Sequence, residues 1–179
     1  MALKKIVSGG QTGVDRAALD AALAAHFPCG GWAPGDRMAE DGIIPERYPL
    51  IPLPNGGYRQ RTRLNVSDSD GSAILYNESL KGGTRLTRNL CALLKRPYIL
   101  INAAETPDTR VAAAAVLKFI EDNAIGTLNV AGPRASGWPA GYRFARDVVS
   151  QVISRLASDL PQGEAHAGER PDRTSGPAR

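Results

Sequence analysis

Short apolar runs alternate with amphipathic stretches along most of the chain. The apolar runs have the length and composition of buried strands and lie at residues 3–8, 30–33, 72–76, 97–101 and 127–130. Between and after them, apolar residues recur every three or four positions, which predicts helices that begin near residues 12, 84, 106 and 138. Strands that alternate with helices predict an α/β fold with a doubly wound, mainly parallel sheet. We therefore expect a single Rossmann-like ligand-binding domain over residues 1–158.

Two segments depart from this alternation. From Pro34 to Asp70 the periodicity is lost among several prolines, and an irregular segment of this length is typical of a binding loop or lid. Within it, only Tyr58 to Leu64 has the pattern of a short helix. Residues 159–179 are rich in Pro, Gly, Ala and charge, which predicts a disordered C-terminal tail.

A glycine-rich turn, Gly9-Gly10-Gln11-Thr12-Gly13, joins the first strand to the first helix. Gly9 and Gly10 allow a tight reversal and a close approach to a ligand. Thr12 is a good N-cap residue, and Asp15 completes a T-x-x-D capping box. The remaining amides and the positive end of the helix dipole would then form a seat for phosphate. A tight connection without a ligand has the same pattern, and the G-G-x-x-G spacing differs from the dinucleotide fingerprint.

A second turn of the same kind, Lys81-Gly82-Gly83-Thr84, follows the strand at 72–76, with a threonine again as the expected helix cap. Two such turns in one parallel sheet both lie at its carboxyl edge, where open α/β sheets bind ligands. Lys81, Arg85 and Arg88 have no structural reason to crowd the positive end of a helix. Their presence favours an anion site over a plain tight turn.

Other basic side chains are further candidates for ligand contacts. Arg134 follows the strand at 127–130, so it also lies at the carboxyl edge of the sheet. Five arginines of the segment 34–70 are compatible with a ligand, a solvated face or salt bridges, namely Arg37, Arg47, Arg59, Arg61 and Arg63.

Asp68 and Asp70 stand in a D-S-D-G motif before the strand at 72–76. Paired carboxylates suit hard cations, but this motif lacks the other ligands of a calcium loop, and no metal site is predicted. Asp68 is interpreted as a turn residue that bonds backbone amides, and Asp70 as an acceptor for N–H groups of a ligand such as a pterin. Trp32 is compatible with stacking on a pterin ring and with a place in the core.

Charge and composition narrow the class of partner. The formal net charge is +4, and because residues 159–179 carry −1, residues 1–158 carry +5, which favours anionic partners. This excess, without a known motif, does not predict nucleic-acid binding. The two cysteines lack the spacing of a zinc site, and neither a signal peptide nor a membrane-length apolar run occurs. We therefore expect a cytoplasmic protein without a membrane partner.

With both turns placed, the order of motifs over residues 5–155 resembles the molybdenum carrier family. The motifs that carry the resemblance are Ser8–Arg16, Gly31-Trp32, Arg37, Ala39–Gly42, Tyr48–Leu50, Arg61-Thr62, Asn65-Val66, Asp68–Gly71, Gly82–Thr84 and Leu128–Arg134. Members of this family include molybdenum-cofactor carrier proteins. They belong to a wider superfamily of Rossmann-like folds that also includes the LOG phosphoribohydrolases.

The resemblance implies that the chain binds, stores or carries molybdenum cofactor, a phosphorylated pyranopterin. It also implies a homo-oligomer, a tetramer or a dimer, with molybdoenzymes or cofactor-synthesis proteins as partners. Arg37 ranks first among the arginines because it belongs to a matched motif. Asp36 departs from the family, which often has lysine at this position, so molybdate and a nucleotide stay open as alternative ligands.

The alternative is an enzyme of the LOG-related superfamily that acts on a nucleotide or an ADP-ribose-like compound, with Asp15 or Asp70 as acid or base. LOG phosphoribohydrolases carry P-G-G-x-G-T-x-x-E, whereas this chain has arginine rather than glutamate on its second turn. No Ser-His or Cys-His arrangement is evident, and no catalytic residue is predicted. The sequence thus favours a binding protein whose expected ligand contacts are Gly9, Gly10, Gln11, Thr12, Gly13, Arg37, Asp70, Lys81, Gly82, Gly83, Thr84 and Arg134.

Overall fold

A six-stranded parallel sheet organises the computed structural model, which describes residues 3–158. The strand order is β5-β2-β1-β8-β6-β7. In chain order these strands are β1 (Lys5–Val7), β2 (Cys29–Pro34), β5 (Leu50–Leu53), β6 (Gly71–Tyr76), β7 (Tyr98–Asn102) and β8 (Thr127–Ala131). Every pairing in the sheet is parallel, which confirms the predicted fold class. The predicted tail at 159–179 lies outside the described residues.

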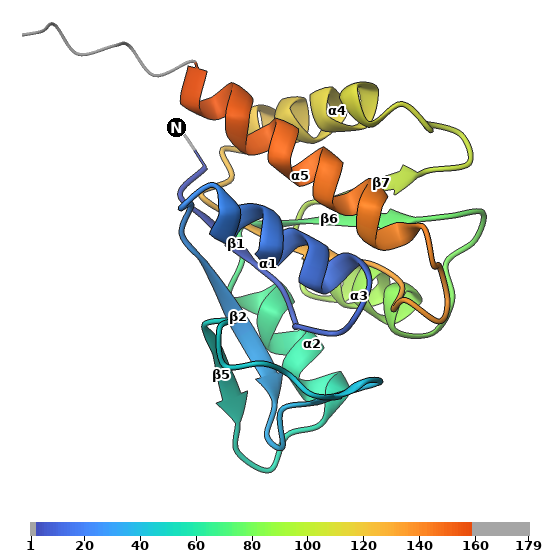
Figure 1. Cartoon of the computed structure of the whole chain (residues 1–179). Coiled ribbons are helices and arrows are strands. Elements are labelled where there is room, and N and C mark those ends of the chain that lie inside the picture. The colour runs from blue at the N-terminus through green and yellow to red at the C-terminus, as the bar shows by residue number, and fades with distance from the viewer. Residues whose placement is uncertain (1–2, 159–179) are drawn as a thin grey trace, which may run out of the picture.

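Within residues 3–158, five helices cover the two faces of the sheet (Figure 1). They are α1 (Val14–Ala24), α2 (Tyr58–Ser67), α3 (Gly82–Leu93), α4 (Thr109–Asp122) and α5 (Gly141–Ser158). Helix α5 packs between α1 and α4 on one face, while α2 and α3 pack against each other on the opposite face. This placement leaves the loops after β1, β8 and β6 together at one edge of the sheet.

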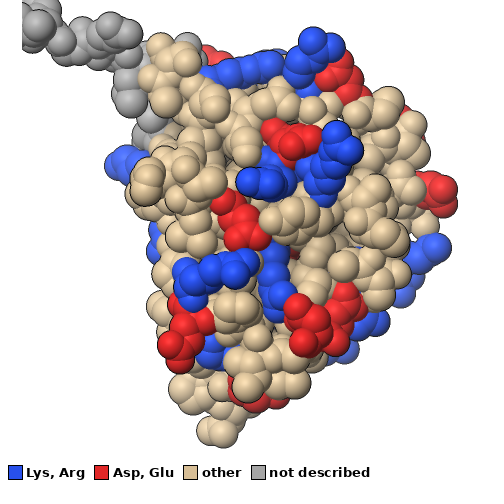
Figure 2. Space-filling view, viewed as in Figure 1, with Lys and Arg blue, Asp and Glu red and all other residues tan. Residues whose placement is uncertain are grey.

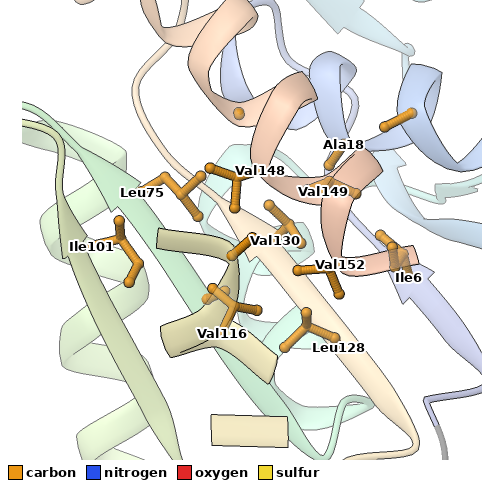
Figure 3. Packing of buried hydrophobic residues seen from close by; sticks show 14 of the residues in the cluster. Ile6, Ala18, Leu75, Ile101, Val116, Leu128, Val130, Val148, Val149 and Val152 are labelled. Carbon is orange, nitrogen blue, oxygen red and sulfur yellow. The ribbon is translucent and has the colours of Figure 1, made fainter. Parts of the chain in front are cut away.

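Apolar side chains are buried on both faces of the central strands. Along β6, Ala73 and Leu75 point into the larger cluster beneath α1, α4 and α5, whereas Ile74 points into the cluster beneath α2 and α3. Figure 3 shows the larger cluster, in which Val148 and Val152 of α5 lie over the sheet. Burial on both faces explains why the parallel strands have continuous apolar sequences.

The segment from Pro34 to Asp70 is more regular than predicted. It contains the short antiparallel pair β3 (Met38–Ala39) and β4 (Gly42–Ile43), the edge strand β5, and helix α2, which extends past the predicted end at Leu64 to Ser67. The predicted irregularity was therefore wrong, whereas a role of this segment in ligand binding stays a prediction. Pro52 is accommodated because β5 pairs with β2 alone, and an edge strand tolerates proline.

The predicted threonine caps were also wrong. Gly13, with φ 77°, is the N-cap of α1, and the Thr12 hydroxyl instead donates to the Glu40 carboxylate and accepts from the Ala135 amide at 3.1 Å. Helix α3 begins at Gly82, so Thr84 lies within its first turn.

Helix α4 likewise begins later than the predicted start at Thr106. Its N-cap is Asp108, whose side chain accepts a hydrogen bond from the Arg110 amide at 2.8 Å. Asp is among the strongest N-cap residues because its side chain can accept from a free helix amide. Thr106 lies two residues further upstream and does not take this role.

Charges are mixed on the face covered by α1 and α5. Figure 2 shows acidic and basic side chains interspersed over this face rather than gathered by sign. The net positive charge of the chain therefore does not form a single basic surface on this side. Within residues 3–158, no helix has both the length and the apolar character needed to cross a bilayer.

Candidate functional site

A pocket of about 550 Å³ lies at the carboxyl ends of β1, β8 and β6. Three loops and the start of α2 line it: Gln11 and Asp15 after β1, residues 131–134 and 137–138 after β8, residues 77–79, 81–84 and 86–87 after β6, and Tyr58, Arg61 and Thr62 from α2. Its volume lies within the usual range for small-molecule sites. The two glycine turns, far apart in sequence, thus lie at the same edge of the sheet, as predicted, and the pocket is lined by Gln11 of the first turn and residues 81–84 of the second.

The N-terminus of α3 is open to this pocket. A Cβ atom placed on Gly82 or Gly83 would meet no atom within 4 Å, and Gly82 has a positive φ of 48°. Within residues 3–158, neither amide donates a hydrogen bond to the protein. The first amides of α3 that do are those of Thr84 and Arg85, which both donate to the Lys81 carbonyl. Lys81, the N-cap residue, is exposed beside them. Two free amides, a helix dipole and an ammonium group together suit a phosphate.

The N-terminus of α1 is closed by the protein itself. The Val14 amide donates to the Pro133 carbonyl at 3.2 Å, and the Arg16 amide donates to the Gln11 carbonyl at 3.1 Å. The loop after β8 packs so closely on Gly13 that a Cβ there would lie 2.6 Å from the Pro133 carbonyl oxygen. The first turn and the start of α1 therefore contribute Gln11 and Asp15 to the pocket, and the helix N-terminus that lines it is that of the second turn.

A buried ion pair forms part of the pocket wall. The Arg61 Nη1 atom lies 3.2 Å from Asp15 Oδ2, and the two side chains are 12% and 5% exposed. Burial raises the pKa of the Asp15 carboxyl, against the opposing effects of Arg61 and of the backbone amides of Gln11 and Gly132. The pair thus places one carboxylate and one guanidinium at the pocket, each with little access to solvent.

Glu40, in the turn between β3 and β4, ties this turn to the loop after β8. Its carboxylate accepts hydrogen bonds from the Ser136 hydroxyl at 2.6 Å, from the Ser136 amide at 3.1 Å and from Thr12, and it lies 3.4 Å from Arg134 Nε. These donors hold the pKa of Glu40 below its ordinary value of 4.5, with the Ser136 and Thr12 hydroxyls as the main causes. The contacts tie the loop after β8 to the β3–β4 turn and place the exposed Arg134 side chain beside Glu40 at the pocket rim.

We expect the Glu40→Gln substitution to lower the free energy of unfolding by about 1 kcal/mol at neutral pH, because charge-assisted hydrogen bonds are lost. Since the folded protein lowers the pKa of Glu40, its stabilising effect is present above pH 4.5 and is lost as the pH falls through the folded-state value. Urea unfolding of both proteins across this pH range measures the difference. The Glu46→Gln variant, at an exposed position, is the control.

Two predicted ligand contacts lie away from the pocket. Arg37 donates to backbone carbonyls of the segment before and within β5, including that of Leu50 at 2.8 Å, so its guanidinium holds this segment in place. Asp70 accepts from the amides of Gly126 and Thr127 at 3.0 and 2.7 Å, at the amino ends of β6 and β8. Both side chains have structural partners, and we leave them out of the proposed site.

The remaining predicted contacts divide between the pocket and its surroundings. Lining residues are Gln11, Lys81, Gly82, Gly83, Thr84 and Arg134. Gly9, Gly10, Thr12 and Gly13 lie in the first turn without lining the pocket. Asp68 lies in a turn, as predicted, at the C-cap of α2. The predicted bonds to backbone amides were wrong, because its carboxylate accepts from the Trp32 indole Nε1 at 2.8 Å and from the Ser67 hydroxyl at 2.9 Å.

Sequence reasoning missed two groups of lining residues. Asn77, Glu78 and Ser79 follow β6 directly, and the rule that ligands bind at the carboxyl ends of parallel strands could have found them. Tyr58 and Thr62 come from α2, a polar helix on the far side of the pocket. No local signal places α2 there, because its position depends on packing against β2 and α3.

The fold and the pocket define a Rossmann-like α/β protein with a small-molecule-sized site at the carboxyl edge of its sheet. A sequence model of the circularly permutated YpsA SLOG family matches residues 6–153, and the chain belongs to this family. The chain is also similar to the crystal structure of a protein named "Putative molybdenum carrier protein" from Syntrophus aciditrophicus SB. The two are 41% identical with a TM-score of 0.82, over 85% of this chain and 96% of that one. A comparison with curated proteins gave no match.

Proposed function

We propose that this protein binds and carries a phosphorylated pyranopterin of the molybdenum-cofactor type. The observation that carries the proposal is the open N-terminus of α3, where Gly82 and Gly83 line a pocket large enough for such a ligand and their amides have no acceptor within residues 3–158. The phosphate would accept hydrogen bonds from these amides, and Lys81 and Arg134 would balance its charge. The name of the similar structure, a molybdenum carrier, agrees with this ligand class.

The rest of the pocket suits the organic part of the ligand. Tyr58, Leu86 and Trp138 supply apolar surface, whereas Asn77 and Glu78 supply acceptors for N–H groups of a heterocycle. Pockets of this mixed character fix the orientation of a ligand through a small number of polar contacts. Molybdenum would enter as part of the cargo. In the cell we expect a cytoplasmic homo-oligomer that delivers the cofactor to molybdoenzymes or receives it from cofactor-synthesis proteins.

One observation favours an enzyme as a second candidate. Asp15 is a buried carboxyl at the pocket, and burial raises its pKa, as is common for groups that act as acids or bases. In this alternative, Asp15 would serve a reaction on a nucleotide or an ADP-ribose-like compound bound at the same α3 turn. Asp70, at the opposite edge of the sheet, has no access to such a ligand.

A single preparation tests the carrier against the enzyme. We expect the purified full chain to retain or take up pterin and molybdenum, measured by pterin fluorescence and elemental analysis, after incubation with molybdenum cofactor released from a molybdoenzyme. Incubation with nucleoside monophosphates and ADP-ribose should leave these compounds intact. Release of free base or ribose phosphate, lost in the Asp15→Asn variant, would instead establish the enzyme. Failure to bind the cofactor would contradict the carrier.

A further inference from the structure

The buried arginine of the pocket has an incomplete set of hydrogen bonds. Among the buried side-chain nitrogen and oxygen atoms of residues 3–158, Arg61 Nε is the one without a partner. A guanidinium has five N–H donors, and the hydrogen bond of this one to a protein acceptor runs from Nη1 to Asp15. Buried donors are almost always satisfied in native proteins, and an exception calls for a missing acceptor.

Gly9 provides a seat for this guanidinium. A Cβ atom on Gly9 would lie 1.2 Å from Arg61 Nη1 and 2.1 Å from Arg61 Cζ, so the guanidinium rests directly on the glycine backbone. Gly9 does not line the pocket, but Arg61, which it contacts, does. The absence of a side chain at residue 9 therefore leaves the space that the Arg61 guanidinium occupies.

The position of Arg61 on α2 separates it from its neighbours. Arg59 and Arg63 are four residues apart and share a helix face, which is exposed, whereas Arg61 lies on the opposite face. Arg61 alone of these three lines the pocket. An arginine that serves only as a surface charge has no need of burial, of an ion-pair partner and of a glycine seat together.

We propose that Arg61 is a second anion-binding residue of the pocket, distinct from the α3 turn, and that Gly9 is the positioning residue for its guanidinium. The ligand would then carry two acidic groups, a phosphate at Gly82 and Gly83 and a second oxyanion at Arg61. At present, Nη1 donates to Asp15 and Nε has no partner. After a small rotation of the Arg61 side chain, Nε and the second Nη atom would donate together to the two oxygens of an oxyanion, the paired geometry that guanidinium groups favour. This inference rests on the proposed function only for the phosphate at Gly82 and Gly83, and the oxyanion site at Arg61 is argued independently of it.

In a phosphorylated pyranopterin that carries molybdenum, the two acidic ends are the phosphate and the oxo-anionic metal centre. Inorganic molybdate supplies the second group without the first. A monophosphate without a second acidic group supplies the first without the second. These three ligands therefore distinguish Arg61 from the α3 turn, because each anion-binding group should respond to a different part of the ligand.

Binding constants of four full-length proteins for molybdenum cofactor test the proposal. We expect Arg61→Gln and Gly9→Ala each to lose at least tenfold in affinity for the cofactor, and less than twofold for a pterin monophosphate without metal. Arg59→Gln, on the exposed face of the same helix, is the matched control and should bind like the parent protein. A folded Arg61→Gln protein with unchanged affinity for the cofactor would overturn the proposal.

A double-mutant cycle tests the role given to Gly9. If Gly9 acts through Arg61, the Gly9→Ala substitution should cause no further loss of affinity in the Arg61→Gln protein. Additive losses would show that Gly9 does not position Arg61. Thermal unfolding of each variant identifies any protein that is not folded. If Arg61→Gln does not fold, Gly9→Ala alone decides, because the atoms that its Cβ would displace belong to the end of a side chain rather than to the backbone.

Crystals of the parent protein soaked with tungstate, an analogue of molybdate, give a result that does not depend on the pterin. We expect an anomalous peak within hydrogen-bond distance of the Arg61 guanidinium. A peak at the α3 turn alone, or no peak in the pocket, would overturn the second anion site. Failure of the parent protein to bind any pterin, with a tungstate peak at Arg61, would instead contradict the proposed function and leave Arg61 as an oxyanion site.

Discussion

Replacement of Gly83 by alanine should weaken ligand binding at least tenfold while the free energy of unfolding stays the same or rises by up to about 1 kcal/mol. The backbone of Gly83 has an ordinary φ, and a Cβ there meets no protein atom within 4 Å, so the new methyl group enters only the pocket. There it would occupy the space of an oxyanion on the two free amides. Stability and affinity should therefore change in opposite directions.

The measurement is a pair of experiments on the same protein, urea unfolding and titration with the phosphorylated ligand. Gly57→Ala is the matched control, because Gly57 is the N-cap of α2, lacks a positive φ and does not line the pocket. That variant should keep its affinity. Unchanged binding by Gly83→Ala would mean that the phosphate does not lie on the N-terminus of α3.

Replacement of Gly13 by alanine should have the opposite outcome, a loss of about 2–6 kcal/mol in the free energy of unfolding. Gly13 has φ 77°, a conformation that costs a residue with a Cβ about 1–3 kcal/mol. The added Cβ would also lie 2.6–2.8 Å from backbone atoms of Pro133, Arg134 and Ala135, and overpacking of this kind costs about another 1–3 kcal/mol. Backbone atoms cannot rotate away as a side chain can.

Urea unfolding with a constant m-value measures this loss, and Gly83→Ala serves as the control in which a glycine of the other turn is replaced without cost. A Gly13→Ala protein of parental stability that fails to bind ligand would contradict the structural role given to this residue. In that case the first turn would be a ligand site after all.

Most of the fold could be predicted because both faces of the sheet are buried. The strand at 71–76 is mostly apolar, since Leu75 packs under one helical layer and Ile74 under the other. The edge strand β5 could not be predicted in the same way. It has four residues, one of them Pro52, and it forms by pairing with Gly31 and its neighbours, some twenty residues earlier in the chain.

The helix starts show how distant contacts override local propensity. Thr12 has the sequence of a cap, yet its hydroxyl bonds Glu40 and Ala135, which lie 28 and 123 residues away in sequence. The packing of the 133–135 loop against Gly13 decides where α1 begins. A pattern of neighbouring residues contains no information about that loop.

The candidate site was predictable as a location and only partly as a set of residues. Sheet topology places the loops after β1, β6 and β8 at one edge, which the repeated glycine turns indicated. Helical spacing separates Arg61 from Arg59 and Arg63, but it does not say which face of α2 meets the pocket. Arg37 matched a family motif, and its guanidinium holds the backbone before β5 instead.

The most direct test of the central claim is the response of individual backbone amides to a phosphorylated ligand, followed by nuclear magnetic resonance on the nitrogen-15-labelled full chain. We expect the amide signals of Gly82 and Gly83 to shift most strongly on titration with the pterin phosphate, while those of Gly9, Gly10 and Gly13 move little. Strong shifts in the first turn with none at Gly82 and Gly83 would contradict a phosphate site at the N-terminus of α3.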